Sequence, residues 1–279
     1  MKLHQATYSR IDSPANERVK QLAKMVGNTN ALRAQGLACA EGLHLCTELF
    51  KHLPRHLREV WIPEPLLNHA EWLALHPLEC AVNTRFVVVP PAVYKKMSSL
   101  SSPTGPLVVF APPEDLCAPN LENNLLVLDG IQDPGNVGVV LRNAAAAGIQ
   151  QVAYSAQSAW VWGDKTLRAG MGAQFALRFC KESTVLDALQ SAHTPPPIRS
   201  TCLSDRSESL YQLDLTTPGV WVFGSEGQGV SQAWLQRATV HVRIPQSNAV
   251  ESLNVASSSA VCLFEQRRQC LQGSTKQAK

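Results

Sequence analysis

The amino-acid sequence predicts an α/β protein in two parts: a C-terminal, mostly parallel sheet with helices on both faces, and a smaller N-terminal α/β domain. From residue 123 onward, short apolar runs typical of buried strands alternate with segments of helical periodicity. Residues 111–120 are rich in proline and lack that periodicity, as is typical of a linker. A chain of 279 residues also exceeds the usual size of a single domain.

The N-terminal part shows helix and strand patterns in alternation. Ser13-Pro14 and the residues up to Met25 predict a capped helix with proline at its first position. A further helix is expected at 43–53, and strands are expected at 59–62, 86–89 and 107–110. These elements predict a small domain over residues 1–111, followed by a linker over 112–122.

The C-terminal part alternates more regularly. Strands are expected near 125–129, 151–154, 198–203, 219–223 and 240–244, and helices near 136–147, 184–192, 231–237 and 253–269. The alternation predicts parallel strands joined by helices, in a domain over residues 123–272 that ends in a polar tail over 273–279. A right-handed winding without knots is the default for such a sheet.

Composition and charge narrow the class of protein. Hydrophobic residues make up 45% of the chain, which is enough to build cores and excludes a disordered protein. The net charge is only +3, so bulk charge does not by itself argue for a nucleic-acid partner, and any face that binds one must arise from local clustering of basic residues. The eight cysteines form no C-x-x-C pair, so no metal site is expected. No apolar stretch reaches membrane-spanning length and the start has no signal region, so we expect a cytoplasmic protein.

Three turns beside predicted strands and helices carry unusual residues. The turn at 130–135 is rich in Asp, Pro and Gly and leads into an apolar helix that contains Arg142, a charge that needs a partner in such surroundings. Residues 224–229 form a glycine-rich turn with one acid, Glu226. Ser252 and Asn254 lie at the start of an apolar helix, where either a helix cap or a bound ligand would satisfy their hydrogen bonds.

Together, the three turns resemble the motifs of the SpoU (TrmH-like) family of RNA ribose 2′-O-methyltransferases, in the SPOUT superfamily. The matching residues are Asn136-x-Gly138-x-x-x-Arg142-x-Ala144, Gly224-x-Glu226-x-x-Gly229, and Ile244-Pro245 followed by Glu251-Ser252-Leu253-Asn254-Val255. Three motifs in this order are a specific match over residues 123–272. Segments around Ser13, Ala40-Glu41-Gly42 and 104–108 resemble, more loosely, the L30e-like substrate-binding domain that precedes the catalytic domain in many members.

The resemblance implies a cytoplasmic homodimer that uses S-adenosylmethionine to methylate a ribose 2′-hydroxyl of structured RNA. An L30e-like domain is typical of members that act on ribosomal RNA, so ribosomal RNA is favoured over tRNA. The family fold contains a C-terminal trefoil knot, which the residue pattern alone does not indicate. The family also builds its active site against a second subunit.

The resemblance assigns the site residues as well. It places Gly224, Ile244 and Leu253 against the cofactor, and it gives catalytic roles to Asn136, Arg142, Glu226, Ser252 and Asn254. The two asparagines are expected to orient Arg142 and the substrate through their amides.

Physical chemistry limits these roles. Because a guanidinium group stays protonated, we expect Arg142 to grip the ribose phosphate and to stabilise the developing alkoxide. An ion pair with Glu226 or Asp129 that only holds the helix in place is the alternative. Glu226 either positions Arg142 or accepts the proton, and Ser252 either contacts the substrate or caps the final helix.

Basic residues near the expected site predict an RNA-binding face. Lys165, Arg168 and Arg178 flank a glycine-rich turn, and Trp160 and Trp162 lie nearby for base stacking. Arg18 and Lys20 share the first predicted helix and are further candidates for contact with RNA. Solvated charges and a buried Trp pair, without any RNA contact, are the alternative interpretation.

Other functions fit part of the pattern. A tRNA methyltransferase, or an inactive RNA-binding or assembly protein on the same fold, would share the motifs, although the intact Asn136, Arg142, Glu226 and Asn254 argue against an inactive protein. A nucleotide-dependent oxidoreductase fits the strand and helix alternation alone. It fits poorly because neither glycine turn has the pattern G-x-G-x-x-G at the start of a helix.

Overall fold

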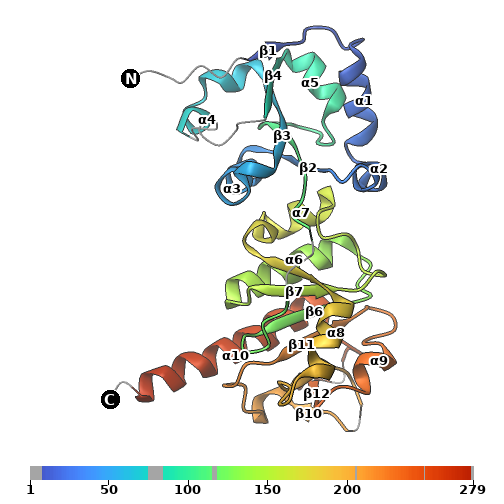
Figure 1. Ribbon diagram of the computed structural model, residues 1–279, viewed down its shortest axis with the longest axis vertical. Coiled ribbons are helices and arrows are strands. Elements are labelled where there is room, and N and C mark those ends of the chain that lie inside the picture. Colours follow the sequence, from blue (N-terminus) through green and yellow to red (C-terminus); the bar gives the residue numbers. More distant parts are fainter. Residues whose placement is uncertain (1–7, 75–83, 115–117, 205, 248, 278–279) are drawn as a thin grey trace. The chain divides into compact units, whose positions relative to one another are not determined.

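The protein is represented by a computed structural model that describes residues 8–74, 84–114, 118–204, 206–247 and 249–277, with side chains described as far as residue 273. The chain forms two compact units (Figure 1). The first unit combines residues 1–113 with residues 162–175, and the second combines 114–161 with 176–279. A short segment of the C-terminal half therefore belongs to the first unit.

The first unit is a five-stranded mixed sheet with helices packed on it. Its strands have the spatial order β1-β4-β3-β5-β2, in which β5 runs antiparallel to both of its neighbours. The elements are β1 (Ser9–Arg10), α1 (Glu17–Met25), α2 (Thr29–Ala34), β2 (Ala38–Glu41), α3 (Leu43–His52), β3 (Leu57–Pro63), α4 (Ala70–Ala74), β4 (Arg85–Val89), α5 (Pro91–Met97), β5 (Leu107–Phe110) and α7 (Asp164–Gly170). Short 3-10 turns occupy Pro54–His56 and Glu64–Asn68.

The first helix begins later than its sequence predicts. Asn16 is the N-cap residue of α1, because its side-chain oxygen accepts a hydrogen bond from the Arg18 backbone N–H at 2.9 Å. The predicted cap at Ser13-Pro14 is therefore wrong by about one turn of helix.

The second unit is a seven-stranded sheet in which every pair of neighbouring strands is parallel. Its strands have the spatial order β10-β12-β9-β11-β6-β7-β8. The elements are β6 (Leu125–Asp129), α6 (Pro134–Ala147), β7 (Gln151–Tyr154), β8 (Arg178–Lys181), α8 (Glu182–Ser191), β9 (Ile198–Thr201), β10 (Glu208–Ser209), β11 (Val220–Gly224), α9 (Gln232–Leu235), β12 (Val240–Arg243) and α10 (Val255–Gln277), with a 3-10 turn at Leu210–Gln212. A further 3-10 turn, at Ala173–Ala176, ends the segment that belongs to the first unit. The predicted α/β class with a parallel sheet is confirmed.

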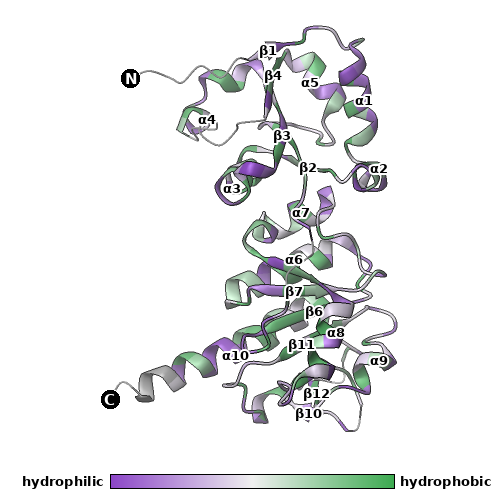
Figure 2. Ribbon diagram, in the orientation of Figure 1, coloured by the Kyte–Doolittle hydropathy of each residue, from purple (hydrophilic) through white to green (hydrophobic). Residues whose placement is uncertain are grey.

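Helices cover both faces of this sheet. Val222 of β11 packs with Val185 of α8 and Trp234 of α9 on one face. On the other face, the indole N–H of Trp221 donates to Gln266 Oε1 of α10 at 2.8 Å, and α10 also packs along α6. Strands covered on both faces are apolar at successive positions, which is the pattern of β6 and β11 in Figure 2. Because all strands are parallel, the turns that follow β6, β9, β11 and β12 meet at one edge.

Residues 162–175 interrupt the predicted domain of 123–272. Trp162 stacks on Phe175 with ring centroids 6.2 Å apart, and both rings contact Phe110 of β5 edge to face. Trp162 is only 2% exposed. It therefore belongs to the core of the first unit, and the expectation that it stacks on RNA bases is wrong.

Candidate active site

The first turn of α6 positions Asn136 at the carboxyl edge of the parallel sheet. Asp133 is the N-cap residue, with its side chain accepting from the Asn136 backbone N–H at 2.8 Å, and Pro134 occupies the first helical position. The turn from β6 into α6 is thus fixed by local residues. This leaves the Asn136 side chain free for contacts with other loops.

The Asn136 amide joins the three motif turns. Its Nδ2 donates to Glu226 Oε1 at 2.5 Å, and its Oδ1 accepts from Asn254 Nδ2 at 3.0 Å. A carboxamide has both a donor and an acceptor, so one side chain can serve both neighbours. Three residues that are far apart in the sequence therefore form one hydrogen-bonded chain, as the motif resemblance predicts for residues of one site.

The turn that carries Glu226 is held by its own backbone. Ser225 and Gly229 exchange two backbone hydrogen bonds, at 3.0 and 2.9 Å, and Gly229 has a φ of +69°. A Cβ at position 224 would overlap the backbone of Gly229 and Val230. The glycine at 224 is therefore required by the close approach of the chain to itself, and not only by the approach of a cofactor.

Asn254, and not Ser252, caps the final helix. Asn254 Oδ1 accepts from the backbone N–H groups of Ala256 at 2.8 Å and Ser257 at 3.4 Å. Ser252 is exposed and lies two residues before the cap, so the cap role considered for it is wrong. Asn143 of α6, which the sequence analysis did not single out, donates to Ala256 O at 2.9 Å and fastens α6 to the start of α10.

A cavity of about 640 Å³ lies beside this hydrogen-bonded chain. All three predicted cofactor residues line it, namely Gly224, Ile244 and Leu253, together with the predicted catalytic residues Glu226, Ser252 and Asn254. Residues 201–203, at the end of β9, also line it and were not predicted. Their position follows from β9 lying between β11 and β12, and strand order is not visible in the sequence.

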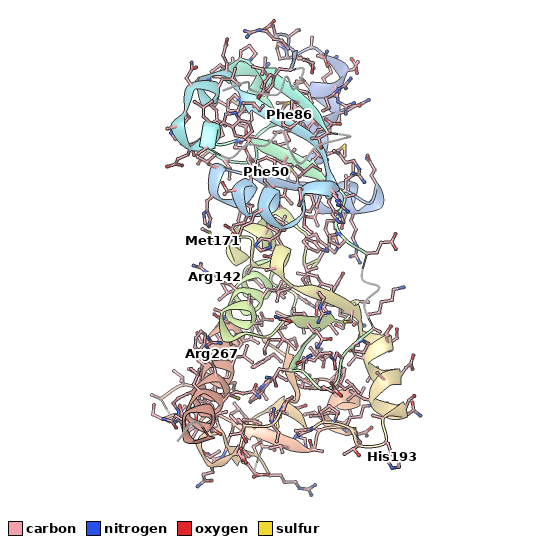
Figure 3. The ribbon with its side chains drawn as sticks, turned by 60° about the vertical axis from the view of Figure 1, so that its left-hand side comes forward. Phe50, Phe86, Arg142, Met171, His193 and Arg267 are labelled. Carbon is pink, nitrogen blue, oxygen red and sulfur yellow. The ribbon has the colours of Figure 1, made fainter. Side chains whose placement is uncertain are left out.

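Arg142 lies away from this cavity. It is six residues after Asn136 on α6, which places it about 9 Å further along the helix axis and about 120° around it. The side chain is exposed on the outer side of α6 (Figure 3). Within the described part of the chain it has no hydrogen bond or ion pair. The contacts of Arg142 expected with Glu226, Asp129 or the two asparagines are therefore wrong for a single chain. Glu226 instead accepts a hydrogen bond from Asn136. Asp129 accepts one from the Ser231 backbone N–H at 2.6 Å.

Three of the five basic residues expected to bind RNA form ion pairs, and Arg178 is exposed. Arg18 pairs with Glu59, Lys20 pairs with Glu17, and Arg168 pairs with Asp164. Lys165 is exposed.

Among the residues that the structure describes, no group of three or more His, Cys, Asp or Glu side chains is placed to hold a metal ion. In the same part of the chain, no helix has both the length and the apolar character needed to cross a membrane.

Comparison with known proteins decides the family. The sequence model of the SpoU rRNA Methylase family matches residues 123–264, which contain all three motif turns. The chain belongs to the SpoU rRNA methylase family. An uncharacterized tRNA/rRNA methyltransferase of Synechocystis sp. is 32% identical over 95% of this chain and 96% of its own length. The 23S rRNA (guanosine-2′-O-)-methyltransferase RlmB of Pseudomonas putida is 27% identical over 82% of this chain and 95% of its own length.

Solved structures of SpoU proteins share the fold. The crystal structure of an RNA 2′-O ribose methyltransferase has a TM-score of 0.75 and 30% identity, and it covers 94% of this chain and 99% of that protein. An AdoMet-bound rRNA methyltransferase from Sinorhizobium meliloti has a TM-score of 0.80 at 22% identity, over 94% of this chain and 98% of its own. The structural similarity to these two proteins extends over both compact units of this SpoU chain. It therefore reaches beyond residues 123–264, which the family model matches.

Proposed function

We propose that this protein transfers a methyl group from S-adenosylmethionine to a ribose 2′-hydroxyl of structured RNA, and that the RNA is ribosomal. The observation that carries the proposal is the hydrogen-bonded chain of Glu226, Asn136 and Asn254 beside the 640 Å³ cavity. The three residues come from the three family motifs. They hold a carboxylate at the edge of a cavity large enough for a cofactor.

The cavity fits S-adenosylmethionine in size and lining. Its volume lies within the range of about 300–1,000 Å³ that is usual for small-molecule sites. Val230, Leu235, Val242 and Ile244 give it an apolar wall, which suits an adenine ring. When bound there, S-adenosylmethionine supplies an electrophilic methyl group on its sulfonium sulfur.

The chain itself supplies positioning and acid-base chemistry. Methyl transfer needs the ribose oxygen in line with the methyl carbon, and the hydroxyl must lose its proton as the new bond forms. Asn136 holds one oxygen of the Glu226 carboxylate, whereas Oε2 has no hydrogen bond with any described residue. We assign Glu226 Oε2 as the proton acceptor, with Asn136 and Asn254 as the residues that orient it.

Arg142 completes the site from a second subunit in this proposal. It stands exposed on α6 next to Val139, which is 38% exposed, and α10 packs along α6 with Phe264 exposed on its surface. Val139 and Arg142, three residues apart on α6, present an apolar and a charged side chain side by side, which favours an interface between copies of the chain. A homodimer would bring Arg142 of each subunit to the cavity of the other, where its N–H groups stabilise the developing alkoxide.

The remaining expectations follow from the family. A trefoil knot in the second unit and a cytoplasmic location belong to this proposal. The first unit, with Lys165 and the ion-paired Arg18, Lys20 and Arg168, is proposed to hold the RNA. The Lys20–Glu17 pair is exposed on both sides, and such a pair contributes only about 0–1 kcal/mol, so Lys20 can exchange its carboxylate for a phosphate at little cost.

Incubation of the purified protein with methyl-labelled S-adenosylmethionine and total RNA from a strain that lacks the gene tests the proposal. The RNA is separated by size, digested to nucleosides and analysed for label. Label in a 2′-O-methylated nucleoside of ribosomal RNA is the expected result, and assembling ribosomal particles serve as a second substrate. Label in tRNA would overturn the ribosomal assignment, and label on a base would overturn ribose methylation. Cofactor binding without label on any substrate would favour an inactive RNA-binding protein.

A further inference from the structure

A single positive charge lines the described wall of the cofactor cavity, the space of about 640 Å³ beside the three motif turns. It belongs to Arg243, the last residue of β12. The other charged residues on the described wall are Glu226 and Glu251. The proposed mechanism uses Glu226, whereas Arg243 belongs to none of the three motifs and has no role in that mechanism.

Arg243 is held by a carbonyl oxygen of the segment that follows β9. Its Nε–H donates to Ser207 O at 3.2 Å. Ser207 is only 8% exposed, and its hydroxyl donates to Cys202 O at 3.1 Å and accepts from the Ser204 backbone N–H at 3.2 Å. Cys202 and Leu203 of the same segment line the cavity. One edge of the guanidinium is therefore fixed to a part of the cavity wall that has its own internal hydrogen bonds.

The rest of the Arg243 guanidinium has no partner in the described part of the chain. Its two Nη groups form no hydrogen bond or ion pair there, so the N–H donors that they carry remain available. Guanidinium donors form a planar fork that matches the two oxygens of a carboxylate. Because Arg243 is exposed where it lines the cavity, a bound molecule can reach these donors.

The charges of S-adenosylmethionine match the charges of this wall. The cofactor carries one anionic group, its α-carboxylate, together with the cationic sulfonium and α-ammonium groups. Glu226 and Glu251 attract cations and repel a carboxylate at short distance. On the described wall, only Arg243 has the charge that attracts the carboxylate. The distribution of charge therefore favours a cofactor bound with its carboxylate at Arg243.

We propose that Arg243 binds the α-carboxylate of S-adenosylmethionine, and that this contact makes the cavity selective for cofactors with an intact amino-acid group. The inference rests on the proposed function, which seats the cofactor in this cavity. Ser207 is the positioning residue, because its carbonyl oxygen orients the guanidinium. A solvated surface charge without contact to the cofactor is the alternative that the experiment excludes.

Binding of two compounds that differ only in the carboxylate tests the contact without methyl transfer. They are S-adenosylhomocysteine and its decarboxylated form, S-adenosyl-3-thiopropylamine. Isothermal titration calorimetry with the full-length protein measures both dissociation constants. We expect S-adenosylhomocysteine to bind about tenfold more tightly, since a hydrogen bond between charged groups is lost with the carboxylate. Equal affinities would overturn the proposal, and this comparison needs no variant.

Arg243→Gln extends the comparison to the residue itself. We expect the affinity for S-adenosylhomocysteine to fall about tenfold, and the affinity for the decarboxylated compound to stay close to that of the wild type. Arg243→Lys keeps the charge but loses the planar fork, so it should recover part of the affinity for S-adenosylhomocysteine. Arg237→Gln, at an exposed position outside this cavity, is the matched control and should bind both compounds as the wild type does.

The outcomes separate the carboxylate contact from general damage to the cavity and from the proposed function. An equal loss of affinity for both compounds in Arg243→Gln would assign Arg243 a structural role and overturn the contact. Unchanged binding of both compounds would assign it to the solvated surface and overturn the contact as well. A protein that prefers S-adenosylhomocysteine through Arg243 but methylates no RNA would overturn the proposed function and leave the contact standing. RNA methylation by a protein without this preference would overturn the contact alone.

Discussion

At the scale of single residues, Asn136 connects the three motif turns of the second unit. It is separated by 90 residues from Glu226 and by 118 residues from Asn254, yet its amide contacts both. Aspartate at this position would offer only acceptors and would set two carboxylates against each other. The residue type is therefore determined by the need to donate on one side and to accept on the other.

Asn254 caps α10 and also donates a hydrogen bond to Asn136 in the candidate site, whereas Ser252 does not cap the helix. One substitution at each position compares their contributions to stability. Asn254→Ala removes the N-cap of α10 and should lower the free energy of unfolding by about 0.5–2 kcal/mol. Ser252→Ala removes an exposed hydroxyl and should change it by less than about 0.5 kcal/mol. Urea denaturation of both variants measures the difference. Equal losses of stability in the two variants would contradict the assignment of the cap.

Gly224 and Gly227 form a second matched pair. A methyl group at 224 meets the backbone of Gly229 and Val230, whereas one at 227 meets no atom within 4 Å. Gly224→Ala should therefore cost about 1–3 kcal/mol and weaken cofactor binding, because the turn must move. Gly227→Ala should leave the stability nearly unchanged. Thermal unfolding with and without S-adenosylmethionine reports both effects, and a stable, cofactor-binding Gly224→Ala protein would count against the turn geometry.

At the scale of helices and strands, apolar runs in the sequence predicted the central strands of the sheet. The short strands at the sheet edges could not be predicted in this way. The runs at 125–129 and 219–223 predicted β6 and β11 to within a residue, since central parallel strands are apolar on both faces. At the sheet edge, β8 has two buried residues, Phe179 and Cys180, between exposed Arg178 and Lys181. Four residues without alternation are too few to distinguish a strand from a loop. The two-residue β10 gives even less signal.

The same limit applies to the candidate site. Residues of the three motifs could be found from the sequence because the resemblance fixed their order. Asn143 and the end of β9 could not, because their roles depend on which helix packs on α6 and which strand lies beside β11. Arg142 was expected to need a partner within an apolar helix, whereas the structure leaves it exposed. Its exposure depends on which face of α6 remains uncovered, and the sequence does not show this.

The long helix α10 is attached to the sheet by a buried polar residue. Gln266, 3% exposed, accepts from the Trp221 indole at 2.8 Å and donates to Asn124 Oδ1 at 3.0 Å. Gln266→Leu keeps the volume but leaves the Trp221 N–H unpaired, at a cost of about 1–3 kcal/mol.

Denaturant titrations of Gln266→Leu and of the exposed Gln272→Leu provide the comparison for α10. We expect the Gln272 variant to match the wild type within about 0.5 kcal/mol. Loss of stability confined to Gln266→Leu would support the attachment of α10 through this network. Equal stability of the two variants would show that the buried network contributes little.

At the scale of the whole molecule, the segment 162–175 breaks the simple division at residue 113. Its aromatic residues complete the core of the first unit, while the chain on either side of it belongs to the second. The composition of residues 111–120 predicted where the first unit ends in the sequence. It did not predict that residues 162–175 return to the first unit. Residues 162–175 pack in the first unit because Trp162 and Phe175 are buried against Phe110. The composition of the linker does not determine this packing.

The assembly of the active site is the last property that belongs to the whole molecule. In one chain, Arg142 and the Glu226 cavity are separate, so the proposed dimer makes a distinct prediction for mixed subunits. Arg142→Ala and Glu226→Gln should each lower methyl transfer by about 10²–10⁴-fold while the protein stays folded. Co-expression of the two variants with different affinity tags yields dimers that contain one subunit of each kind.

If Arg142 acts across the interface, one site of the mixed dimer combines an intact Glu226 with an intact Arg142 from the partner subunit. The other site carries both substitutions. Because a symmetric dimer has two equivalent sites, the purified mixed dimer should recover about half of the wild-type rate per dimer. Each variant alone, carried through the same two-tag purification, is the control and should stay inactive. Activity that does not rise in the mixed dimer would place Arg142 in the site of its own subunit, because only a contribution from the partner can then restore a complete set of residues.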